Sequence, residues 1–193
     1  MIIGIDIDNT ISHTTEMIMN YVEIFGRENQ LNTVADLSEY YLEQSLGWEE
    51  ATAARFLDTY LPNIYKEVQP KPYAVDVIRE LHEKHSIVLV TSRNQQFPYV
   101  TEATLEWLHR YGLKYDKLVM NNTRNMHYFS KLDACLDNNI ELMIEDHHDL
   151  VLELSARLPV IMFHYPYNAH ISAKNIRRVE NWLEIKAIIE SFE

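Results

Sequence analysis

Two aspartates, Asp6 and Asp8, stand at the end of an isoleucine-rich run that begins at Ile2. Two carboxylates in such surroundings are costly to remove from water unless a positive group compensates them. A turn or helix-capping role explains Asp8 but leaves Asp6 unexplained. We therefore expect a positive group between the two carboxylates.

A second acidic pair, Glu145 and Asp146, closes a later apolar run in the same way. If both runs are strands of one parallel sheet, their carboxyl ends share an edge, and this pair lies close to Asp6. A hard divalent cation with oxygen ligands would resolve the repulsion, and Mg²⁺ fits best because it accepts one or two carboxylates together with waters and substrate oxygens. The alternative is that Glu145 and Asp146 are solvated surface acids.

Other polar residues at the strand ends are suited to holding a phosphate group. Thr91 and Ser92 follow the apolar residues 87–90, where a hydroxyl and a free backbone N–H could bind a phosphate oxygen. Arg93 follows closely enough to reach a substrate. Lys131 precedes the strand of Glu145 by one short helix and could supply a point charge. For each, an ordinary turn or a solvated side chain is the alternative.

The elements that must position these residues alternate strictly between helix and strand from Pro72 onward. Five strands joined by helices predict an α/β fold, a doubly wound Rossmann-like parallel sheet with ligands outside the carboxyl ends of its strands. The predicted strands cover 2–7, 87–91, 117–120, 140–144 and 160–163, and the helices of this part cover 73–84, 98–111, 130–136, 150–157 and 176–189.

Residues 12–69 are predicted to be a helical insert after the first strand, so that 1–11 and 70–193 form one core. We expect helices there at 37–46 and 48–60, with Pro62 closing the block. The insert has an aromatic character that could stack a nucleobase or simply fill its own core. The aromatic residues in question are Tyr21, Phe25, Tyr40, Tyr41 and Trp48.

Composition narrows the class of protein. No segment approaches the eighteen or so apolar residues of a membrane helix, and the N-terminus lacks the basic region of a secretory signal. The one cysteine, Cys135, cannot form an internal disulfide, so we expect a cytoplasmic protein. A net charge of −12 argues against DNA or long RNA as a ligand. A small phosphorylated substrate remains compatible if a metal ion, a lysine and backbone N–H groups supply positive charge locally.

In their order and placement these motifs resemble the four signature motifs of the haloacid dehalogenase (HAD) superfamily. The resemblance implies that Asp6 is the nucleophile, Asp8 the general acid and base, and Thr91 a ligand of the phosphoryl group, while Lys131 steadies nucleophile and phosphate. It also implies Mg²⁺ held by the Asp6 carboxylate, the Asp8 carbonyl, Glu145 and Asp146. Many members carry Asp-Asp or Gly-Asp in the last motif, so either Glu145 or Asp146 could be the direct ligand. The matching stretches are Asp6-x-Asp8-x-Thr10, Val-Leu-Val-Thr91-Ser92, Lys131 and Ile144-Glu145-Asp146-x-x-Asp149.

The second aspartate, Asp8, favours phosphoryl transfer, because a phosphatase must protonate an alkoxide leaving group whereas a dehalogenase needs no such acid. The insert matches the small helical cap of many superfamily phosphatases. With the Val-Thr-Ser-Arg stretch and the compact length, the chain most resembles the bacterial branch of the 5′(3′)-deoxyribonucleotidase family. The expected function is Mg²⁺-dependent hydrolysis of nucleoside monophosphates through an aspartyl phosphate. A sugar-phosphate phosphatase or phosphomutase, a dehalogenase and a non-catalytic phosphate-binding protein are the alternatives, and a homodimer is left open.

Overall fold

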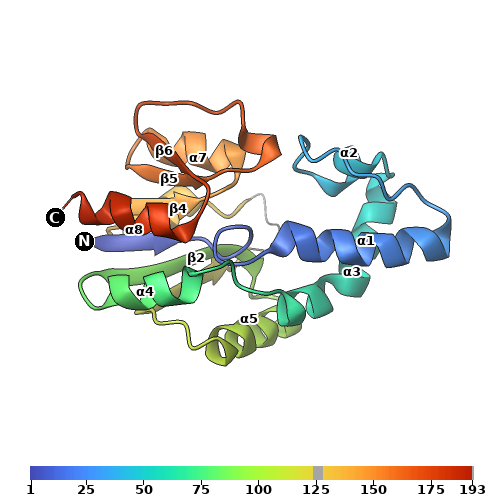
Figure 1. The fold of residues 1–193 in the computed structure, drawn as a ribbon. Coiled ribbons are helices and arrows are strands. Elements are labelled where there is room, and N and C mark those ends of the chain that lie inside the picture. The colour runs from blue at the N-terminus through green and yellow to red at the C-terminus, as the bar shows by residue number, and fades with distance from the viewer. Residues whose placement is uncertain (124–127, 193) are drawn as a thin grey trace.

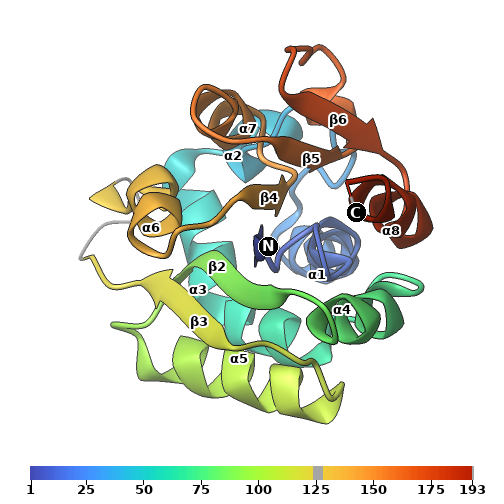
Figure 2. The ribbon, with the colours of Figure 1, turned by 90° about the vertical axis from the view of Figure 1, so that its left-hand side faces the viewer.

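The computed structural model describes residues 1–123 and 128–192, and its centre is a parallel sheet of six strands (Figures 1 and 2). The strand order is β3-β2-β1-β4-β5-β6, so the chain winds outward in both directions from β1. Ile3 of β1 pairs with Ile87 on one side and with Leu142 on the other. The point where the winding reverses, between β1 and β4, is the place where ligands bind in folds of this kind. The strands are β1 (Ile2–Ile5), β2 (Ser86–Asn94), β3 (Lys117–Asn121), β4 (Leu142–Glu145), β5 (Val160–Phe163) and β6 (Ile176–Val179).

Helices cover both faces of the sheet (Figure 2). In β2, Ile87 and Leu89 pack into one hydrophobic cluster while Val88 and Val90 pack into another on the opposite face. Burial on both sides explains why the strand is an uninterrupted apolar run. The first face carries α4 (Ala74–His82), α5 (Pro98–Arg110) and α8 (Trp182–Glu190), and the second carries α6 (Lys131–Asp137) and α7 (His148–Ser155).

The insert contains three helices. It lies beyond the carboxyl ends of the strands, opposite the end where both termini lie (Figure 1). It has a hydrophobic cluster of its own, in which Phe25 and Phe56 are buried. Two linkers join it to the rest of the chain and are paired with each other through an antiparallel bridge between Ser12 and Pro70. The helices of the insert are α1 (Thr14–Asn29), α2 (Leu42–Leu46) and α3 (Glu50–Glu67).

The predicted closing helix at 176–189 is wrong over its first part, where Ile176–Val179 form β6 instead. The reason is tertiary: Ile176 pairs with Val160, and the guanidinium of Arg178 donates to backbone carbonyls of the preceding loop. The helix starts at Trp182, where the Asn181 side chain accepts from two backbone N–H groups. The sheet therefore has six strands rather than about five.

Two boundaries within the insert also differ from expectation. Pro62 does not end a helix but lies inside α3, which continues because Ile64 in its last turns is buried in the insert cluster. Proline removes one helical hydrogen bond, and packing outweighs that loss here. The predicted helix at 37–46 is reduced to its last residues, because the Asp36 carboxylate bonds the backbone N–H and hydroxyl of Ser38 in a local turn.

Across residues 1–123 and 128–192, no helix is both long and apolar enough to cross a membrane.

The central strand provides a test of the packing. Ile3 has no exposed surface and pairs on both sides, so Ile3→Ala should lower the free energy of unfolding by about 2–5 kcal/mol through lost burial and a residual cavity. Urea denaturation measures the change. Val34→Ala, at a side chain that is 79% exposed, is the control and should stay within about 0.5 kcal/mol of the wild type. Equal effects at the two positions would contradict this packing.

Candidate active site

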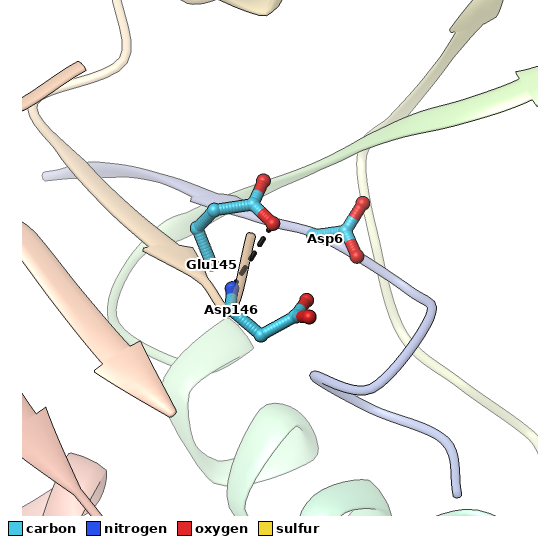
Figure 3. A group of neighbouring side chains, drawn as sticks. All are labelled: Asp6, Glu145 and Asp146. Carbon is cyan, nitrogen blue, oxygen red and sulfur yellow. Dashed lines mark hydrogen bonds between the residues drawn. The ribbon is translucent and has the colours of Figure 1, made fainter. Parts of the chain in front are cut away.

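Three carboxylates from two adjacent strand ends point toward one another (Figure 3). Asp6 directly follows β1, and Glu145 and Asp146 are the last residue of β4 and its successor. The backbone N–H of Asp6 donates to the carbonyl of Ile144 at 3.0 Å, which fixes the two strand ends side by side. One oxygen from each of the three carboxylates lies within 4.8 Å of the others, and all three residues are buried. The convergence predicted at the sheet edge is therefore present.

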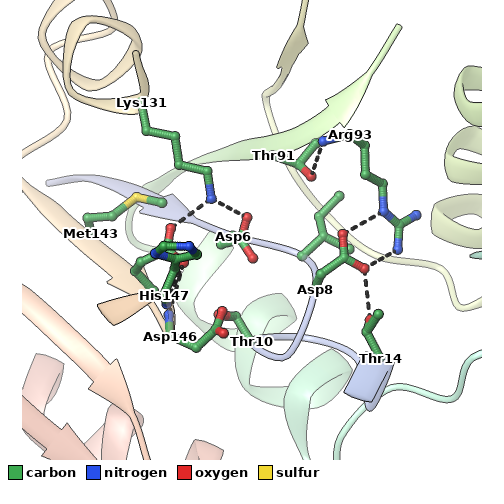
Figure 4. A network of polar contacts seen from close by, with 12 residues as sticks. Asp6, Asp8, Thr10, Thr14, Thr91, Arg93, Lys131, Met143, Asp146 and His147 are labelled. Atoms are coloured by element: carbon green, nitrogen blue, oxygen red, sulfur yellow. Dashed lines mark hydrogen bonds and ion pairs between the residues drawn. The ribbon is translucent and has the colours of Figure 1, made fainter. Parts of the chain in front are cut away.

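Lys131 joins two of these carboxylates (Figure 4). Its Nζ lies 2.5 Å from Asp6 Oδ1 and 2.7 Å from Glu145 Oε2, and the lysine side chain is only 3% exposed. The residue opens α6, whose start is fixed by the Ser130 side chain accepting from the backbone N–H of Asp133. Lys131 is therefore not a solvated lysine, and its ammonium group is held between the acids of β1 and β4.

Burial and charge move the pKa values of this cluster in different directions. Burial raises the pKa of Asp6 well above its usual value, against the opposing effect of Lys131. Burial, followed by the neighbouring Glu145 charge, raises the pKa of Asp146 to about 8. Burial acts on Glu145 too, but the Lys131 ammonium and hydrogen bonds to its carboxylate hold that pKa below the usual value. A cation placed among the three oxygens would favour the ionised forms of Asp6 and Asp146.

The two acids of the last motif have different partners. Glu145 accepts from Lys131 and, through Oε1, from the backbone N–H groups of Asp146 and His147. Asp146 accepts from the Thr10 hydroxyl at 3.2 Å and from the Tyr167 hydroxyl at 2.5 Å. The donors to the Glu145 carboxylate are thus an ammonium group and two backbone N–H groups, whereas the donors to the Asp146 carboxylate are hydroxyl groups.

The loop after β1 places Asp8 on the other side of Asp6, toward β2 (Figure 4). Asn9 turns the chain with a left-handed φ of 59°, a conformation that asparagine tolerates better than most residues. The carbonyl of Thr10 accepts from Trp182 Nε1 of α8 at 3.0 Å, which ties the loop to the last helix. Asp8 itself is paired with Arg93, and although burial acts to raise its pKa, this guanidinium holds the pKa below the usual value.

The end of β2 brings the remaining predicted residues to the same edge. Thr91 is fully buried, and its Oγ1 accepts from the backbone N–H of Arg93 at 3.2 Å. Ser92 is half-buried beside it. The Arg93 side chain is buried against Asp8 rather than exposed in a loop. Asp149 of the last motif is different: its side chain is 70% exposed in the first turn of α7, where it pairs with His148.

Beside the carboxylates lies a largely apolar cavity of about 470 Å³, formed where the insert meets the loop after β5. Tyr167 lines it and also donates to Asp146, so the cavity wall touches the acidic cluster. The Tyr40 ring, also in the wall, lies 5.1 Å from the Tyr167 ring and 4.1 Å from that of His147. Further lining residues include Met19, Leu37, Leu42 and Tyr165.

Of the aromatic residues that the sequence singled out in the insert, only Tyr40 lines this cavity. Phe25 and Trp48 are buried in the insert cluster, and Tyr21 packs on Tyr60. Tyr167 and Tyr65 contact the site residues but were missed, because neither follows a motif and each approaches from a distant element. Thr10 belongs to the first motif, but its bond to Asp146 had no signal in the sequence.

The fold has known counterparts among HAD-like hydrolases. A haloacid dehalogenase-like family hydrolase from Streptococcus pneumoniae, SP0104, superposes with a TM-score of 0.70 at 14% identity, over 97% of each chain. At 14% identity this likeness shows the fold alone, and the HAD superfamily is shown by the match of the sequence to a family of HAD-like nucleotidases.

The family is shown by sequence. Residues 1–192 match the family described as 5′ nucleotidase, deoxy (Pyrimidine), cytosolic type C protein, and the chain belongs to this family. YqfW of Bacillus subtilis, provisionally named a nucleotidase, is 32% identical over 187 residues, which cover 94% of this chain and 90% of that protein. BH1399 of Halalkalibacterium halodurans, named in the same way, is 24% identical over 98% of this chain and 92% of its own length. The protein is accordingly an enzyme of the phosphatase and nucleotidase class.

The raised pKa of Asp146 predicts a pH dependence in the absence of divalent cations. Unfolded Asp146 ionises near pH 4 whereas the folded residue keeps its proton to about pH 8, so the folded state binds the extra proton and stability must fall as pH rises through this window. Urea denaturation in EDTA at pH 5 and pH 8 should therefore show that Asp146→Asn gains on the order of a few kcal/mol relative to the wild type at the higher pH. A difference in the free energy of unfolding between Asp146→Asn and the wild type that does not change with pH would refute the raised pKa of Asp146.

Proposed function

We propose that this enzyme hydrolyses phosphomonoesters, nucleoside monophosphates foremost, through a covalent phosphate ester on Asp6 with Mg²⁺ bound beside it. The observation that carries the proposal is the charge balance at the sheet edge. Four carboxylates meet two cationic side chains there, so with all four acids ionised two negative charges lack compensation, and one divalent cation would neutralise them. The carboxylates are Asp6, Asp8, Glu145 and Asp146, and the cations are Lys131 and Arg93.

The residues present fit Mg²⁺, which prefers oxygen ligands and few carboxylates. We assign the metal to the carboxylates of Asp6 and Asp146 and to the backbone carbonyl of Asp8. Glu145 is already bonded to Lys131 and two backbone N–H groups, so it acts on the metal site by fixing the lysine and adding charge rather than as the direct ligand. When bound, the ion would offset the negative charge of the phosphoryl oxygens.

In the proposed reaction, an Asp6 carboxylate oxygen attacks phosphorus in line and the bond from phosphorus to the ester oxygen breaks. Asp8 first takes up a proton, which the negative charge of the incoming phosphate favours, and gives it to the departing alkoxide, which leaves as an alcohol. Asp8, now ionised, then takes a proton from the water that attacks the aspartyl phosphate, releasing inorganic phosphate and restoring Asp6. Lys131, Thr91 and Ser92 would donate to the phosphoryl oxygens and oppose the developing charge.

The helical insert, residues 12–69, would serve as the cap of the core formed by 1–11 and 70–193. Its position beyond the strand ends is suited to covering the phosphate and excluding water. The paired linkers at Ser12 and Pro70 give such a cap a single narrow attachment.

A nucleoside as the leaving group is supported by two observations. The apolar cavity beside the acids is walled by Tyr40, Tyr165 and Tyr167, and aromatic rings of this kind bind nucleobases by stacking. The family description names a cytosolic enzyme that acts on deoxy pyrimidine nucleotides. A cytoplasmic location is part of the same proposal, and the homodimer stays a prediction.

Replacement of the nucleophile tests the mechanism. Asp6→Asn should abolish Mg²⁺-dependent hydrolysis of p-nitrophenyl phosphate, with at least a 10³-fold loss expected from removal of a covalent nucleophile, roughly as in other such enzymes. Asp133→Asn, at an exposed acid of the same helix as Lys131, is the matched control and should keep wild-type turnover. Undiminished turnover by Asp6→Asn would exclude the aspartyl phosphate.

A substrate panel tests the choice of leaving group against the sugar-phosphate alternative. Deoxynucleoside and ribonucleoside monophosphates should give higher kcat/KM than hexose and pentose phosphates, because only the nucleotides carry an aromatic group for the tyrosine-walled cavity. Release of free phosphate is the readout, with and without Mg²⁺. Hexose phosphates turned over much faster than every nucleotide would overturn the nucleotidase assignment while leaving the phosphatase chemistry intact.

A further inference from the structure

The Arg93 guanidinium is bonded within the protein at all three of its nitrogens, and Figure 4 shows the two bonds to Asp8. Nε donates to Asp8 Oδ2 at 2.9 Å and Nη2 to Asp8 Oδ1 at 2.8 Å, while Nη1 donates to the Thr104 hydroxyl of α5 at 3.2 Å. The arginine side chain has no exposed surface. A two-pronged pair of this kind fixes the plane of the carboxylate as well as its distance.

The strand is shaped to present this side chain. In the pairing of β2 with β3, Thr91 lies opposite Met120 and Asn94 opposite Asn121, so the residues between them on β2 are an interruption of the ladder. Such bulges re-aim side chains next to active sites. Here the bulge holds Ser92 and Arg93, and the arginine extends across to the loop after β1.

The insert contacts the same pair from two helices. The ring of Tyr65, near the end of α3, lies over the guanidinium, with Cζ 3.9 Å from the ring centroid. The Thr14 hydroxyl, at the start of α1, donates to Asp8 Oδ1 at 2.8 Å. Asp8 therefore has one bidentate partner from the core, Arg93. Both ends of the insert reach this pair, α1 by a bond to Asp8 and α3 by a ring contact with Arg93.

We propose that Arg93 is a positioning residue that fixes the Asp8 carboxylate for proton transfer, and that Tyr65 makes this hold depend on the position of the insert. The inference rests on the proposed function, in which Asp8 moves the protons. With the insert over the strand ends, the Tyr65 ring lies on the guanidinium and the Thr14 hydroxyl bonds the carboxylate, so a displacement of the insert would remove both contacts. This role differs from the direct substrate contact that the sequence suggested for Arg93.

Kinetics of Arg93→Met and Arg93→Lys separate the two roles. For a nucleoside 5′-monophosphate, whose alkoxide needs a proton, kcat of Arg93→Met should fall on the order of 10²-fold with KM changed less than about threefold. Arg93→Lys keeps the positive charge but cannot make the two parallel hydrogen bonds to Asp8, so it should recover only part of this loss. With p-nitrophenyl phosphate, whose leaving group needs little protonation, Arg93→Met should release a burst of about one equivalent of nitrophenol before slow turnover, because water activation by Asp8 is impaired.

Arg110→Met is the matched control. Arg110 also links α5 to the end of α3, through the carbonyl of Lys66, but it is exposed and pairs with Glu106 rather than with an acid of the site, so kcat and KM should be unchanged. A raised KM with intact kcat in Arg93→Met would overturn the proposal in favour of direct substrate binding, and unchanged kinetics would overturn it outright. If Arg93→Met fails to fold, the kcat and KM of Arg93→Lys decide by the same criteria.

The coupling to the insert is tested by a double-mutant cycle. Tyr65→Ala should lower kcat, Tyr65→Phe should lower it less because the ring remains, and adding Tyr65→Ala to Arg93→Met should cause no further loss. Losses in kcat that multiply in the double variant would refute the coupling.

The wild-type enzyme is the reference throughout. If it hydrolyses no phosphate ester, the proposed function fails and this inference fails with it. An active wild type with an unaffected Arg93→Met refutes this inference alone.

Discussion

The buried ion pairs of Lys131 are the constraint on which the rest of the site depends. An ammonium group with 3% of its side chain exposed cannot be left without partners, and neither can the Asp6 and Glu145 carboxylates that it touches. These bonds require β1, β4 and the start of α6 to arrive at one point. The strand order provides this directly, because β1 and β4 are neighbours at the place where the winding of the sheet reverses. The position of the Lys131 ion pairs therefore follows from the strand order of the sheet.

The acidic residues at the strand ends could be predicted from the sequence as site residues. An acid directly after a run of isoleucines is costly to bury and is rarely found there without a chemical role. That reasoning located Asp6, Glu145 and Asp146, and the parallel sheet then required them to meet. It succeeded because the apolar run of a strand and the acid at its end can both be recognised in the local sequence. The parallel sheet then brings these strand ends together. The sixth strand was missed because Ile176–Val179 carries two arginines in its four residues and so lacks the apolar run that marks the other strands.

Side chains that reach the site from elsewhere could not be predicted. Tyr167 bonds Asp146 from a loop after β5, and Tyr65 covers Arg93 from the far end of the insert. Both depend on how the insert and the loops pack, and no spacing in the sequence records that packing. The same limit applies to substrate choice, since the cavity is assembled from the insert and one core loop while the chemical residues come from the strands. In the proposed enzyme, the residues of the chemical step and those that select the substrate therefore come from different parts of the chain.

The bond from Trp182 to the carbonyl of Thr10 joins the beginning of the chain to its last helix, α8. The strand that leads to Asp6, the proposed nucleophile, is the first to leave the ribosome, but the Trp182 indole that supports the following loop emerges after every other element described. A nascent chain can therefore collapse around its isoleucines long before this support exists. The loop that carries the proposed catalytic acid Asp8 therefore gains this support only when synthesis has proceeded through α8.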